Sequence, residues 1–122
     1  MAYESLIEDF DLIQGDSSPI WFFGLPDGSS LNDGNWNAQC KIMEDYGKPP
    51  LVGGPRTLSL NSGTGLGDEY PIGSKFVFQI LPSESAQLLP NTKYAIVVEI
   101  WNESLNYMCE VARFKCKVLQ GS

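Results

Sequence analysis

Residues 83–101 read SESAQLLPNTKYAIVVEIW, and this stretch decides the fold. Its first half allows one helical turn at most, because Pro90 cannot continue a helix. From Tyr94 onward, apolar residues alternate at a period of two on one face, while Ala95 and Val97 make the other face apolar as well. A strand that is apolar on both faces is expected at the centre of a sheet.

The turn that precedes this strand has the features of a corner between two packed sheets. Ser83 can cap the single helical turn, and Glu84 favours its N-terminus. In residues 89–94, LPNTKY, a tyrosine opens the strand, as in the corner before the penultimate strand of many immunoglobulin-like sandwiches. We therefore expect Tyr94 to pack its ring inward and to bond its hydroxyl to nearby backbone. The alternative is an ordinary aromatic residue in a strand.

Six further segments carry strand patterns separated by turn signals. The clearest is residues 35–45, in which Trp36, Ala38, Cys40 and Ile42 alternate with polar residues. The expected strands are Leu6–Gln14, Ser18–Leu25, Asn35–Asp45, Arg56–Asn61, Lys75–Leu81 and Tyr107–Leu119. The sequence thus predicts an all-β protein, a single antiparallel immunoglobulin-like β-sandwich over residues 1–122 with about seven strands and a short helical turn before the penultimate one. Residues 1–10 are a candidate N-terminal arm.

Two connections are rich in glycine and proline. Residues 46–55 cannot form a central strand and are predicted to be a wandering connection at an edge of the sheet. Residues 62–74 form a loop longer than the architecture needs, and loops of that length are often interaction surfaces. In the last strand Glu110 falls on the inward register. This predicts a β-bulge or an exposed end near Met108–Glu110.

The composition is that of an acidic globular chain. Fifteen acidic residues against eight basic ones give a net charge of -7, and contacts to phosphate need clustered Lys or Arg, so nucleic acid is not an expected partner. No window is long and apolar enough to cross a membrane, and the first residues lack the basic region and apolar run of a secretion signal. We expect a soluble chain made in the cytosol, with no membrane partner.

The numbers and spacing of cysteine and histidine limit the metal, redox and nucleophilic sites that the chain could form. Cys40, Cys109 and Cys116 lack the paired spacings of zinc or redox motifs, so buried reduced thiols are expected. Cys109 and Cys116 are seven positions apart, which places them on opposite faces of an unbroken strand. The chain has no histidine, which removes Ser-His-Asp and Cys-His nucleophiles and imidazole zinc sites. The sequence predicts a protein that is not an enzyme, with no catalytic, cofactor-binding or metal-binding residues.

Two sets of residues could hold an ion. The acidic residues Glu8, Asp9, Asp11 and Asp16 could form a calcium site or a carboxylate pair, but they lack the glycine and glutamate frame of a calcium loop. The favoured interpretation is a solvated edge that discourages aggregation. Residues 63–67, GTGLG, lack the Lys-Ser or Lys-Thr of a phosphate loop and are interpreted as an ordinary loop.

Two further sets could act on or bind sugars. Glu84, Glu99 and Glu103 could supply a glycosidase pair, yet the sequence does not fix their separation. Residues 102–104, NES, match the glycosylation acceptor pattern, which has no consequence without a secretion signal. Loop tyrosines could stack on a sugar ring, although packing against the same domain is the commoner arrangement. The aromatic candidates are Tyr46, Tyr70 and Tyr107, with the tryptophans Trp21, Trp36 and Trp101 if these are exposed.

Four segments carry a resemblance to a known family. They are Gln14–Ser17 before the first hydrophobic strand, Phe76–Ile80, Ser85–Tyr94 and the closing Ala112–Val118. Taken together, from Asp11 onward, they resemble the small immunoglobulin-like domains of tailed-phage virion proteins, found in baseplate upper proteins, tail fibres and neck or tail accessory proteins. The chain departs from that family at Asn91, where glycine is usual, and in the longer middle section of residues 46–74.

The resemblance implies a non-enzymatic structural protein of a phage particle. Its expected partners are other virion proteins and copies of itself, in the tail, neck or baseplate, and its expected location is the virion, assembled in the host cytoplasm. A capsid decoration protein is the close alternative within this class. A carbohydrate-binding module is the alternative from another class, and a hydrolase, which would need a carboxylate of raised pKa in a cleft, is the third.

Overall fold

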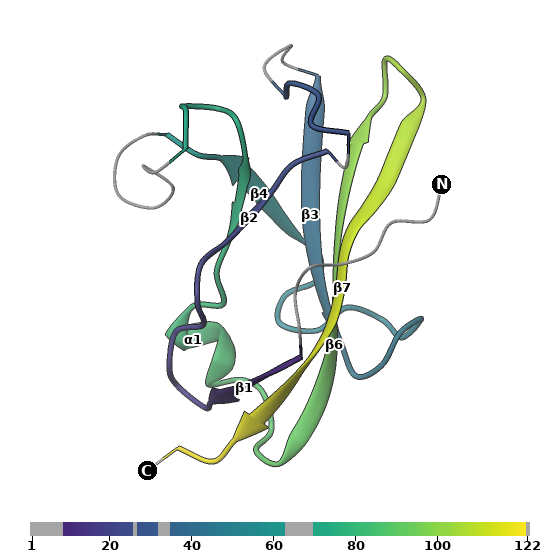
Figure 1. Cartoon of the computed structure of the whole chain (residues 1–122). Coiled ribbons are helices and arrows are strands. Elements are labelled where there is room, and N and C mark those ends of the chain that lie inside the picture. The colour runs from purple at the N-terminus through teal and green to yellow at the C-terminus, as the bar shows by residue number, and fades with distance from the viewer. Residues whose placement is uncertain (1–8, 26, 32–34, 63–69, 122) are drawn as a thin grey trace.

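The protein folds as a curled β-sheet with one helical turn (Figure 1), in a computed structural model that describes residues 9–25, 27–31, 35–62 and 70–121. The elements in chain order are β1 (Phe10–Ile13), β2 (Trp21–Phe23), β3 (Trp36–Met43), β4 (Arg56–Leu60), β5 (Phe76–Phe78), α1 (Pro82–Ser85), β6 (Thr92–Asn102) and β7 (Tyr107–Leu119). All-β structure is confirmed. Residues 6–8 of the first expected strand and most of the candidate arm lie outside the described residues, whereas Phe10 belongs to β1.

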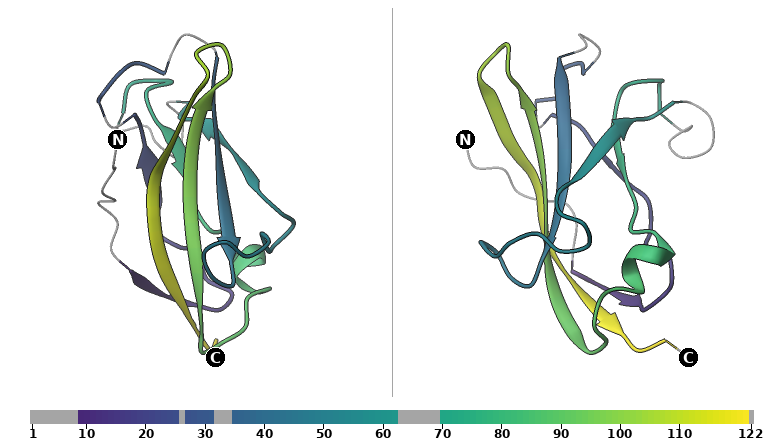
Figure 2. Two further views of the ribbon diagram at one scale, coloured as in Figure 1. Left: turned by 90° about the vertical axis from the view of Figure 1, so that its right-hand side faces the viewer. Right: turned by 180° about the vertical axis from the view of Figure 1, so that it is seen from behind.

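The strands form one seven-stranded sheet in the order β1-β7-β6-β3-β4-β5-β2, curled into a half-barrel (Figure 2). β6 lies between β3 and β7, as its two apolar faces predicted. The prediction of a purely antiparallel arrangement is wrong at one pair, since β1 runs parallel to β7. Parallel neighbours need a long crossover connection, and here the whole of the domain between β1 and β7 supplies it.

β4 joins the two halves of the sheet. Its first residues pair with β3, in the register Ala38 with Leu58, and its last residues pair with β5, in the register Ser59 with Val77. The open side of the half-barrel is closed by aromatic side chains. Phe10 of β1 and Trp21 of β2 have ring centroids 5.0 Å apart, and Trp21 lies 5.2 Å from the ring of Phe114.

The alternating residues of β6 form the centre of the core. Tyr94, Ile96, Val98 and Ile100 are all buried. They pack with buried residues of the neighbouring strands, namely Ala38, Cys40 and Ile42 of β3, Phe76 and Phe78 of β5, and Ala112, Phe114, Cys116 and Val118 of β7. On the other face of β6, Ala95 and Val97 make a second, smaller cluster with Met43, against which Tyr46 packs. Both apolar faces of the central strand are therefore covered.

The strands at β2 and β5 are shorter than the sequence predicted. Ser18 is buried, and its hydroxyl oxygen accepts a 2.8 Å hydrogen bond from the backbone N–H of Ile80. The Gln79 side-chain amide also donates to the Ser18 carbonyl at 3.1 Å. The Ser18 backbone N–H also donates a 3.0 Å bond to the Ile80 carbonyl, so the two segments stay side by side although regular pairing ends at Trp21 and Phe78.

The single helical turn is present, but Ser83 is not its cap. Leu81 occupies the N-cap position and Pro82 begins the helix. The Glu84 carboxylate accepts a 2.8 Å hydrogen bond from the Leu81 backbone N–H, which is the glutamate half of a capping box. Ser83 lies inside the helical turn and is exposed. A proline in the first turn has no N–H to leave unpaired, which is why the helix starts there.

The predicted bulge is present in β7, one residue later than expected. Val98 pairs with Ala112 and Glu99 with Glu110, so Val111 is the extra residue. Both Val111 and Ala112 are buried as a result. The bulge also shifts the phase of the strand, and Cys109 packs against the core that contains Cys116. The expected opposite faces of these two cysteines held for an unbroken strand, and the bulge removes that condition.

Candidate interaction surfaces

The acidic residues near the N-terminus are spread along β1 and the turn after it. Asp9, Asp11 and Asp16 are exposed, and Glu8 lies outside the described residues. The Asp9 carboxylate accepts a 2.8 Å hydrogen bond from the Lys115 backbone N–H. Among the residues that the structure describes, no three His, Cys, Asp or Glu side chains are grouped to hold a metal ion. β1 does lie at an edge of the sheet, where exposed acids oppose edge-to-edge pairing.

The three glutamates considered for a glycosidase pair lie on different elements. Glu84 of α1 forms a 2.8 Å ion pair with Arg56, and Glu99 of β6 forms one of the same length with Lys41. Glu103 is exposed in the turn between β6 and β7, at the opposite end of the molecule from α1 (Figure 1). The structure therefore does not bring these three carboxylates together.

Each loop tyrosine packs against its own domain. Tyr70 contacts Phe22 with ring centroids 4.8 Å apart, and Tyr107 meets Trp36 edge-on at 5.7 Å. Burial raises the pKa of Tyr107, and a hydrogen bond with Cys109 adds to the shift. These tyrosines come from separate parts of the sheet and form no continuous stacking surface. The three tryptophans are half-buried.

Tyr46 forms the centre of a charged shelf on the outer face of β3, β6 and β7. The Arg113 guanidinium lies 4.4 Å from the centre of its ring and the Lys115 ammonium 4.9 Å away. Such cation–π contacts contribute about 0.5–1 kcal/mol each at exposed sites. The ring also packs against the small cluster that contains Val97, and this burial raises the pKa of Tyr46.

The charges of this shelf are paired within the domain. Lys115 donates a 2.9 Å hydrogen bond to Asp45, which lowers the pKa of Asp45 and raises that of Lys115. Arg113 makes two 3.0 Å hydrogen bonds to Glu110.

A hollow adjoins this shelf. It has a volume of about 440 Å³ and is lined by residues of β3, β6, β7 and the 46–55 loop. That loop thus lies on the sheet as well as at its edge, which the sequence pattern did not indicate.

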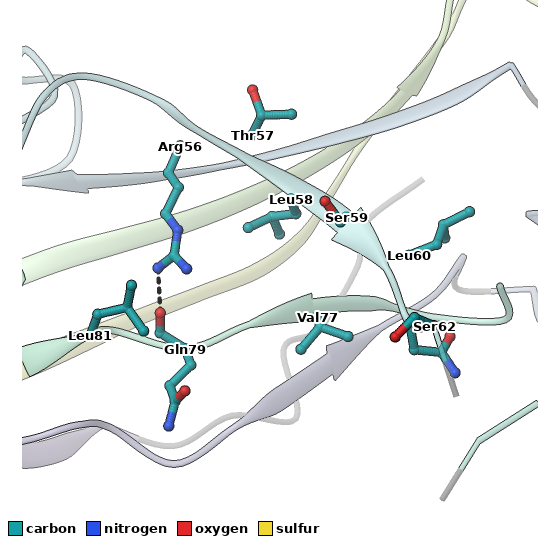
Figure 3. A pocket seen from close by; sticks show the side chains of 10 residues that line it. Arg56, Thr57, Leu58, Ser59, Leu60, Ser62, Val77, Gln79 and Leu81 are labelled. Atoms are coloured by element: carbon teal, nitrogen blue, oxygen red, sulfur yellow. Dashed lines mark hydrogen bonds between the residues drawn. The ribbon is translucent and has the colours of Figure 1, made fainter. Parts of the chain in front are cut away.

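A second hollow of about 370 Å³ opens between β4 and β5, where the two strands diverge (Figure 3). Arg56 spans the divergence, donating to the Gln79 carbonyl oxygen and pairing with Glu84. Thr57 and Ser59 of β4 line the same hollow, which therefore offers hydroxyl and amide groups.

The third feature is the outer edge of β7. β6 pairs with β7 along its length, but β1 covers only Cys116–Leu119 on the other side. Within the described part of the chain, no strand pairs with that side of residues 107–115. The exposed fractions of Met108 and of the adjacent hairpin residue Leu105 are 62% and 63%. Sequence reasoning missed this edge because nothing local shows which strand lies beside which.

No described helix has the length and apolar character needed to span a bilayer. Comparison of the sequence with protein-family models and with curated proteins finds no match. The surfaces themselves are therefore the basis for a functional proposal.

Proposed function

We propose that this protein is a non-enzymatic structural component of a phage particle, an immunoglobulin-like module that mediates protein–protein assembly in the tail, neck or baseplate. The observation that carries the proposal is the corner at Tyr94, whose hydroxyl accepts a 2.7 Å hydrogen bond from the Leu89 backbone N–H. This bond is the tyrosine corner typical of immunoglobulin-like sandwiches. It occurs in one of the segments that carry the resemblance to phage virion domains.

The strand order supports the same assignment. Immunoglobulin-like sandwiches place their third, sixth and seventh strands in one sheet and their second, fourth and fifth in the other. Here β3, β6 and β7 are neighbours in the order β7-β6-β3, and β2, β5 and β4 follow in the order β4-β5-β2. The departures are the position of β1 beside β7 and the pairing of β4 with β3.

An assembly role is supported by the apolar side chains left at the surface. Leu105 and Met108 are exposed at the β6–β7 hairpin, which lies at the opposite end of the molecule from α1 (Figure 1). Leu89, which follows α1 in the chain, has an exposed fraction of 66%. Burial of such exposed apolar side chains against another protein removes them from water and stabilises the complex.

Capsid decoration remains the alternative within the virion class, since the same surfaces would serve on a shell. A carbohydrate-binding module is less favoured, because Tyr46, Tyr70 and Tyr107 pack against their own domain instead of lining one surface. Stacking on sugars needs an exposed aromatic face.

The test is immunogold electron microscopy of particles from the source of the sequence, with an antibody against this chain. Label confined to the tail, collar or baseplate is the expected result. Label spread over the shell would replace the tail assignment with decoration. An unlabelled particle that nevertheless contains its other structural proteins would overturn the virion proposal, and binding of the purified chain to a sugar array would then favour the carbohydrate module.

A further inference from the structure

The open side of β7 carries backbone groups that point away from β6. The Lys115 N–H donates to the Asp9 carboxylate, and the Leu119 carbonyl accepts a 2.8 Å bond from the Gln14 N–H, both on the β1 side. The Val118 carbonyl faces the other way, accepting a 2.6 Å bond from the Asn91 N–H beside β6. Because these directions alternate along an antiparallel strand, the backbone N–H and C=O of Arg113 point to the open side.

Asp9 ends the pairing of β1 on this edge. In a continued ladder, the Lys115 N–H would bond to a backbone carbonyl, but a side-chain carboxylate takes it instead. Pairing of β1 accordingly begins at Phe10, opposite Cys116. Among the described residues, the part of the β7 edge beyond Lys115, residues 107–114, has no strand paired to this side. An open edge of this length is a template for strand addition.

We propose that this edge binds residues 1–8 of a second copy of the chain as an added strand. The inference rests on the proposed assembly function and names its partner. Residues 3–7, YESLI, include aromatic and β-branched side chains suited to a strand, and eight residues match the length of the edge. Arg113 and Lys115 of β7 are already paired with Glu110 and Asp45, so the backbone hydrogen bonds of the open edge are what would hold the added strand.

Proline at position 113 tests the edge directly. Arg113→Pro removes the N–H that points to the open side and leaves the β6 bonds in place, and proline is tolerated on edge strands. Arg113→Ala is the matched control, because it loses the same contacts to Tyr46 and Glu110 but keeps the N–H. We expect Arg113→Pro to raise the apparent dissociation constant for self-association, measured by analytical ultracentrifugation, at least tenfold relative to Arg113→Ala.

Deletion of residues 2–8 tests whether this segment is the strand that binds the edge. The result does not depend on whether β7 tolerates a proline at position 113. The deletion is expected to abolish self-association and to expose the Arg113 amide to hydrogen exchange. A synthetic peptide of residues 1–8, added to the deletion variant, should protect that amide again.

Three outcomes would overturn the inference. They are a monomeric full chain, association that survives the deletion, and Arg113 amide protection that is already full in the monomer, since the last would mean that the edge is occupied within one copy. The proposed function fails separately, by absence of the protein from particles. Labelled particles together with unchanged association of the deletion variant would refute this edge contact and leave the assembly role standing.

Discussion

The backbone N–H of Leu89 donates a hydrogen bond to the hydroxyl oxygen of Tyr94 at 2.7 Å, across five positions of the chain. The ring of Tyr94 is buried in the core, while Leu89 itself is exposed. The bond ties the turn after α1 to the start of β6. It thereby fixes where the central strand begins and the direction in which it enters the sheet.

Replacing Tyr94 with phenylalanine should lower the free energy of unfolding by about 1–3 kcal/mol, because the part-buried Leu89 N–H loses its acceptor. Urea denaturation of the two proteins measures the difference, with an unchanged dependence on urea concentration. Tyr70→Phe is the control, since it removes a hydroxyl from an exposed tyrosine and should change stability by less than about 0.5 kcal/mol. Equal losses in the two variants would contradict a specific contribution of the corner.

Ser85 should stabilise the junction between α1 and the turn after β1. Its buried hydroxyl accepts a 3.0 Å bond from the Gly15 N–H and donates a 2.7 Å bond to the Asp16 carbonyl. Ser85→Ala removes both, and we expect a loss of about 1–3 kcal/mol and faster hydrogen exchange at the Gly15 amide. The exposed Ser83 is the matched control. Unchanged exchange at Gly15 in Ser85→Ala would show that the turn does not depend on this side chain.

The three cysteines should differ in reactivity in the folded protein. Cys40 and Cys116 are buried, and burial raises the pKa of both thiols, whereas Cys109 is half-buried. Because the thiolate is the reactive form, iodoacetamide at pH 7.5 should modify Cys109 first. Peptide mapping by mass spectrometry identifies the site, and all three should react after unfolding. First modification at Cys40 would contradict the described core.

Cys116 should make stability fall at alkaline pH. Burial raises its pKa from the ordinary value of 9.0 to about 12. Between these values the unfolded chain releases a proton that the folded chain retains, so the free energy of unfolding decreases as pH rises. At pH 10.5 the loss corresponds to about 2 kcal/mol, at about 1.4 kcal/mol per pKa unit.

The comparison for this prediction is Cys116→Val, which removes the thiol and keeps an apolar side chain of similar size. The decrease in the urea midpoint between pH 8 and pH 10.5 should be smaller for the variant than for the natural sequence. Tyrosine and lysine titration affect both proteins and cancel in the comparison. The same decrease in both proteins would exclude Cys116 as its source.

Some sequence-based expectations failed because they depend on which strands become neighbours in the sheet. The acids of β1 predicted an edge strand, and β1 is one, but its parallel pairing with β7 depends on residues more than a hundred positions away. The shift of Cys109 to the core side follows from the bulge at Val111. A local pattern indicates that a bulge is needed, while the register of the neighbouring strand decides where it falls.

The sequence by itself determined the central strand, its burial on both faces, the corner at Tyr94 and the alternation in β3, because each of these follows from the spacing of apolar residues within one segment. Only the tertiary structure decided the parallel position of β1, the packing of Tyr46 beneath two cations and the uncovered edge of β7. These features depend on which distant segments become neighbours. The pairing of strands is selected by the free energy of the whole sheet and core, and no single segment encodes it.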